Sequence, residues 1–101
     1  MDYIQVQQAE AENAARATYY RDHGKLLDAA RWYQQTYEVE KKAFKMIAYH
    51  WLEKAADSLE KAGKQDQAIA LKKQALQEKA VDANLTDGDR AAAKKQLESL
   101  G

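Results

Sequence analysis

Long stretches of this chain contain no residue that would end a helix. Proline is absent from all 101 residues, and Gly24 and Gly63 are the only glycines before residue 88. Residues 1–23, 25–62 and 64–83 are therefore free of helix breakers. No run alternates apolar and polar residues for long enough to predict a strand. The pattern predicts helices that are separated by two glycine turns.

The composition favours the same fold class. The chain contains 20 Ala and 10 Gln but only nine β-branched residues, and Ala and Gln are among the residues that enter a helix at little cost. Two Trp, six Tyr and one Phe supply large side chains to bury, which argues against a disordered chain. We therefore expect an all-α fold, and the length predicts one domain that covers residues 1–101.

A third stop precedes the C-terminal segment. Residues 82–89 are rich in Asp and Asn, and Thr86 among them is a good N-cap. Asp87 and Asp89 follow it, where a first turn favours negative charge. This pattern predicts a short final helix over residues 87–99.

The longest uninterrupted run is 25–62. As a single helix it would measure about 57 Å, and its far end would find no packing partner unless the chain dimerised. We therefore predict a turn within residues 38–43, although the charged residues there are good helix formers. The expected helices cover about residues 2–23, 25–40, 42–62, 64–82 and 87–99.

The two turn glycines lie 39 residues apart, and similar residues surround them. Five residues after each glycine stands an alanine, Ala29 or Ala68, and seven residues before each stands another, Ala17 or Ala56. Small side chains at these positions let antiparallel helices approach closely. The repeat therefore predicts two hairpins with equivalent crossings.

This pattern resembles the tetratricopeptide repeat, whose unit is a pair of helices joined by a turn. The resemblance covers roughly residues 10–81, with a period of 39 where the family has about 34. It implies antiparallel helical hairpins in a right-handed array or small helical bundle, closed by the final helix as a solvating cap. The alternatives are a generic array of helical hairpins and the three-helix microtubule-interacting-and-trafficking domain.

The resemblance also implies a function, because such arrays bind partners along the first helix of each unit. We expect a protein–protein interaction module, a scaffold or adaptor, that holds a peptide or helix of a partner protein in a helical groove. Trp32 is a rival site on the outer face, since its neighbour Tyr33 points about 100° away and only one of them fits the apolar stripe. The candidate partner-binding residues are Thr18, Arg21, Trp32, His50, Glu53, Lys54 and Asp57.

A structural protein that assembles with itself is the alternative function. Two repeats are fewer than the roughly three that an independent array needs, so a homodimer could complete the core. The exposed seam of such a dimer would lie on the first helix, along Ile4, Val6 and Ala11.

Other classes are disfavoured by what the sequence lacks. There is no Cys, and of the two histidines, His23 and His50, only His50 has a partner at metal-binding spacing, Glu53, with no third ligand, so we expect no metal and no cofactor. No arrangement of nucleophile and base indicates an enzyme. The charges balance, with 16 basic and 16 acidic residues, which argues against nucleic acid. No apolar run reaches a membrane span and no signal segment is seen, so we expect a cytoplasmic protein.

Overall fold

The computed structural model describes residues 3–44 and 48–100 and contains five α-helices in this part of the chain. No strand occurs among these residues, so the all-α prediction is confirmed. None of the described helices is both long enough and apolar enough to cross a membrane. The helices are α1 (Tyr3–Asp22), α2 (Leu26–Phe44), α3 (Tyr49–Lys61), α4 (Gln65–Ala80) and α5 (Asp87–Ser99).

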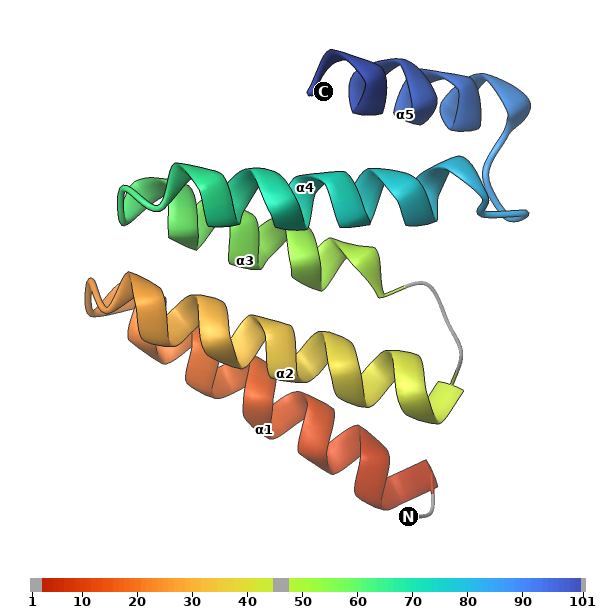
Figure 1. Cartoon of the computed structure of the whole chain (residues 1–101). Coiled ribbons are helices and arrows are strands. Elements are labelled where there is room, and N and C mark those ends of the chain that lie inside the picture. The colour runs from red at the N-terminus through yellow and green to blue at the C-terminus, as the bar shows by residue number, and fades with distance from the viewer. Residues whose placement is uncertain (1–2, 45–47, 101) are drawn as a thin grey trace.

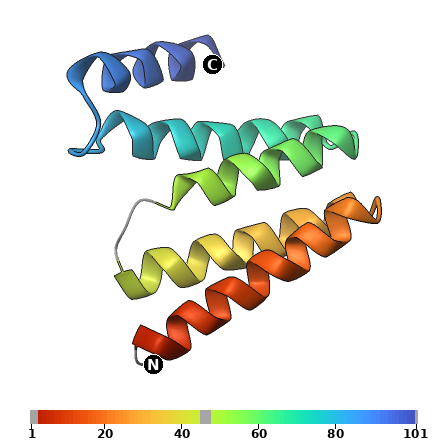
Figure 2. The same cartoon turned by 180° about the vertical axis from the view of Figure 1, so that it is seen from behind.

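Each helix packs against the next one in the chain, from α1 to α5. The α1–α2 hairpin lies beside the α3–α4 hairpin, and α5 runs along the far side of α4 (Figure 1). Comparison with the opposite view shows α1 and α3 in one layer and α2 and α4 in the other (Figure 2). The Cα atoms fill a slab of 36 × 34 × 16 Å.

The two glycine turns are built in the same way. The φ angle is +75° at Gly24 and +81° at Gly63, in the left-handed region that favours glycine. The residue after each glycine donates its N–H to the carbonyl five residues earlier, at 2.8 Å in both turns. This is the 6→1 bond of a Schellman motif, which ends helices in many folds. The turns therefore establish two equivalent hairpins without indicating a particular family.

Small side chains occupy the helix crossings, as the spacing predicts. Ala17, Ala29, Ala56 and Ala68 are all fully buried and belong to one cluster, which Tyr33 completes. A methyl group in each place lets the paired backbones come close, and the larger side chains of Tyr33 and Leu59 complete the cluster. A second cluster further along the hairpins contains Tyr37, Ala48, Leu52 and Ala75.

The predicted turn within residues 38–43 is wrong, because α2 continues through this segment and ends at Phe44. Helix-forming residues dominate here, and two side-chain bonds hold the end of α2. Lys41 Nζ donates to Tyr37 Oη at 2.7 Å, and Trp51 Nε1 of α3 donates to Glu40 Oε2 at 2.5 Å. The third helix begins at Tyr49 rather than near residue 42, and residues 45–47 lie outside the described part of the chain.

The predicted final helix is confirmed as α5. Its N-cap is Thr86, whose Oγ1 accepts a hydrogen bond from the Asp89 N–H at 3.1 Å. Only one residue of α5, Ala93, is buried. A narrow apolar seam therefore attaches this helix to α4. The seam comprises Leu76, Ala80, Ala93, Leu97 and Leu100.

Candidate functional site

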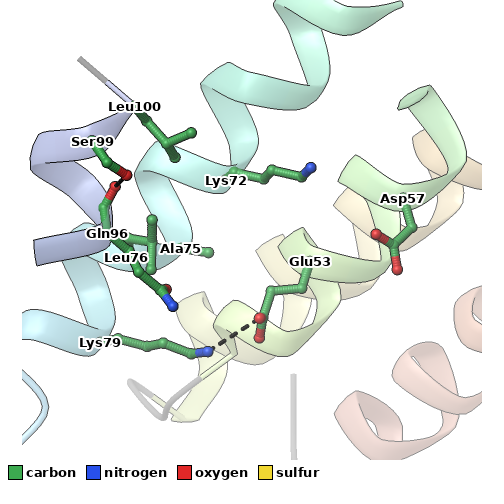
Figure 3. Close-up of a pocket in the computed structure, with 9 residues that line it drawn as sticks. All are labelled: Glu53, Asp57, Lys72, Ala75, Leu76, Lys79, Gln96, Ser99 and Leu100. Carbon is green, nitrogen blue, oxygen red and sulfur yellow. Dashed lines mark hydrogen bonds and ion pairs between the residues drawn. The ribbon is translucent and has the colours of Figure 1, made fainter. Parts of the chain in front are cut away.

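A groove opens where α3 and α5 stand on either side of α4 (Figure 3). One part of it has a volume of about 360 Å³, and α4 supplies an apolar floor there with Ala75 and Leu76. A neighbouring hollow of about 370 Å³ shares Glu53, Lys79 and Gln96 with it and extends it to the start of α3. We call the two together the α3/α5 groove. The remaining lining residues are Tyr49, Asp57, Lys72, Leu85, Asp89, Ala92, Ala93, Ser99 and Leu100.

The lysines of this groove are already neutralised. Lys79 Nζ lies 3.1 Å from Glu53 Oε2, a pair drawn as a dashed line in Figure 3. Lys72 Nζ lies 2.7 Å from Glu60 Oε2. Asp57, in contrast, forms no ion pair with any described residue. Asp89, at the other end of the groove, also forms no ion pair with a described residue, so the unmatched charges of the groove are the carboxylates of Asp57 and Asp89.

The end of the groove near the start of α3 is a fixed polar wall. Tyr49 Oη donates to Asp82 Oδ2 at 3.3 Å, and Lys79 Nζ lies 5.3 Å from the centre of the Tyr49 ring. Burial, followed by the negative charge of Asp82, raises the pKa of the Tyr49 phenol. The phenol therefore stays protonated at neutral pH, and its one hydrogen is used by Asp82.

Four of the predicted binding residues lie on α3. Two of them line the groove, and the other two lie on the exposed side of the helix. Glu53 and Asp57 line the α3/α5 groove. His50 and Lys54 are exposed, and the 100° rotation per residue places them on the outer crest of α3, between the directions of Glu53 and Trp51. The His50 ring lies 4.6 Å from the Trp51 ring. A partner that crosses α3 would meet all four predicted residues.

The two predicted residues of α1 are not part of this groove. Thr18 is half-buried, and Arg21 is exposed and pairs with Asp22 at 3.2 Å. Neither side chain lines the α3/α5 groove. The predicted binding face is thus split between the first hairpin and the second.

Trp32 lies on α2, in the other layer, and is half-buried rather than open on the outer face. It packs against the main core cluster, with the guanidinium of Arg16 4.9 Å from its ring centre and that of Arg31 at 5.8 Å. Its indole Nε1 is buried and has no hydrogen-bond partner in the described structure. These contacts give Trp32 a packing role between α1 and α2.

Sequence reasoning missed the residues that α4 and α5 bring to the groove. The charge pattern around Lys72 predicts a solvated face, and the final helix is predicted to act as a cap. The structure instead uses Gln96, Ser99 and Leu100 of that helix as one wall of the groove. No local signal marks them, because the wall exists only once α5 has packed beside α4.

A second hollow of about 330 Å³ lies on the other side of α3, and we call it the α1/α3 groove. Trp51 lines it from α3. The residues from α1 are spaced at three and four positions, so they share one helix face. They are Gln7, Glu10, Ala11 and Ala14.

The described residues include no group of three or more His, Asp or Glu side chains placed to hold a metal ion. No protein-family model, no curated protein and no solved structure matches this chain. The resemblance to tetratricopeptide repeats therefore stays a prediction from the sequence.

Proposed function

We propose that this chain is a protein–protein interaction module that binds a peptide or helix of a partner protein in the α3/α5 groove. The observation that carries the proposal is the groove itself, which has an apolar floor, polar walls and a shape set by three packed helices. Helical or extended segments bind such grooves by placing side chains at regular spacing into the hollow.

The charges on the groove indicate what kind of segment fits. Because Lys72 and Lys79 are already paired, an acidic partner would have to replace an existing ion pair. A basic residue would instead gain an unmatched carboxylate, that of Asp57 or Asp89. The floor consists of Ala75 and Leu76, so small or medium apolar side chains suit it. The preferred partner segment is therefore apolar on one side and carries a basic residue near Asp57 or Asp89.

A variant that fills the groove tests this proposal. Gln96 is an exposed wall residue that lines both parts of the groove, so Gln96→Trp should occupy the hollow without disturbing the core. Lys95→Trp is the matched control, because Lys95 is also exposed on α5 but lines neither part of the groove. Partners captured with the wild-type chain would be purified, and their affinity for each variant measured by calorimetry.

The proposal requires that Gln96→Trp weakens a purified partner's binding by about tenfold or more while Lys95→Trp binds like the wild type. Equal affinity for both variants would remove the groove from the interaction. Sedimentation of the wild type tests the homodimer alternative. A dimer that Gln96→Trp disperses and Lys95→Trp does not would mean that a second copy fills the groove.

A further inference from the structure

The α1/α3 groove combines an aromatic ring with negative charge. Trp51 lines it from α3, and Glu10 lines it from α1 between small residues that leave space. Glu40 of α2 lies at the edge of the ring and accepts a hydrogen bond from Trp51 Nε1 at 2.5 Å. This bond fixes the position of the indole and places a buried carboxylate beside the groove.

The two carboxylates are close enough to interact and are not neutralised by the described residues. Neither Glu10 nor Glu40 forms an ion pair in the described structure. Burial and the charge of Glu40 together raise the pKa of Glu10. A like-charge pair beside an open hollow is stabilised by any cation that enters it.

We propose that the α1/α3 groove receives the guanidinium group of an arginine residue in a partner protein. A guanidinium can stack against an indole and donate to a carboxylate at the same time, because it is planar and carries five N–H donors. An ammonium group satisfies the charge but stacks less well and is more strongly hydrated. The site goes beyond the proposed function, since it lies on the opposite side of α3 from the α3/α5 groove.

The test is a titration of the full chain with N-acetyl-arginine amide, followed by NMR of the two tryptophan indole N–H groups. N-acetyl-citrulline amide, which has the same shape without the charge, serves as the ligand control at equal ionic strength. We expect arginine to cause a saturable shift at Trp51 with little change at Trp32, and citrulline to cause neither.

Glu10→Gln should weaken this binding about three- to tenfold, the scale of one ion pair at a partly exposed site. Glu12→Gln is the matched variant, because Glu12 is also on α1 but is exposed and outside the groove. Equal shifts with arginine and citrulline, or binding that Glu10→Gln leaves unchanged, would overturn the proposal. Because the ligand is a small molecule, these results do not depend on whether the α3/α5 groove binds a partner.

Discussion

At Gly63 the backbone alone explains why the residue is glycine. A Cβ added there would meet nothing within 4 Å, so space is not the constraint. The φ angle of +81° is the constraint, because other residues clash with their own backbone in that region. His23 contributes differently at the equivalent turn, where its Nδ1 lies 2.7 Å from the carbonyl oxygen of Tyr19. This contact engages one of the last carbonyl groups of α1.

Replacing Gly63 should therefore cost stability without a clash. We expect Gly63→Ala to lower the free energy of unfolding by about 1 kcal/mol, and Gly63→Val to lower it further because β-branched residues tolerate positive φ poorly. Gly88→Ala is the control, since Gly88 lies in α5 outside the left-handed region and should become neutral or slightly more stable. Urea denaturation measures all three variants. A neutral Gly63→Val would mean that the turn relaxes to another conformation.

The raised pKa of Glu10 predicts how the stability of the fold changes with pH. Its pKa is raised in the folded chain above the usual 4.5, so its contribution favours folding most below that value and is lost as pH rises through the raised pKa. Gln at this position does not titrate. We expect Glu10→Gln to gain thermal stability relative to the wild type as the pH rises from about 4 to 7. Glu12→Gln should show no such trend, and a loss with rising pH would indicate that Glu10 is ion-paired.

Among the elements, α4 shows how a helix crossing selects a small side chain. Ala68 is 1% exposed and packs in the same cluster as Ala29, Ala55 and Ala56. No cavity is left for additional methylene groups in such a close-packed cluster. The hairpins therefore depend on alanine at this position as much as on the glycine of the turn.

Overpacking this crossing should destabilise the second hairpin. Ala68→Leu adds three carbon atoms to a filled site and should lower the free energy of unfolding by about 1–3 kcal/mol. Ala70→Leu on the same helix is exposed and should stay within about 0.5 kcal/mol of the wild type. Thermal melts followed by circular dichroism compare the two. A parent-like melt for Ala68→Leu would contradict the close crossing.

At the scale of the whole molecule, the helices form a flat stack rather than a sphere. The radius of gyration is 14.1 Å, whereas a compact chain of about 100 residues has about 13 Å. Polar bonds tie the hairpins across this slab. Tyr37 Oη on α2 donates to Glu78 Oε1 on α4 at 2.8 Å, and Gln74 Nε2 donates to the same hydroxyl at 3.2 Å. The flat shape leaves room for both grooves on one layer.

The bond between Tyr37 and Glu78 should matter to global stability. Tyr37→Phe keeps the buried ring but removes one donor to Glu78 Oε1, which keeps its ion pair with Lys41 at 3.2 Å, while Oε2 of this carboxylate is buried and has no hydrogen-bond partner in the described structure. We expect a loss of about 1.5–3 kcal/mol in the free energy of unfolding. Tyr19→Phe, at an exposed tyrosine, should change it by less than about 0.5 kcal/mol. Chemical denaturation of both variants measures these changes. Equal denaturation midpoints for Tyr37→Phe and the wild type would show that this bond contributes nothing to stability.

The sequence by itself determined the helices, the two glycine turns and the Thr86 cap, because propensity, positive φ and capping act within a few residues. The prediction from the sequence was wrong at the end of α2, where the length of the run 25–62 led us to expect a turn. Hydrogen bonds from Trp51 to Glu40 and from Lys41 to Tyr37 hold this segment in the helix instead. Both grooves were decided by tertiary structure alone. Their walls come from helices that are far apart in the chain, and only packing brings Glu10 to Trp51 or Gln96 to Glu53.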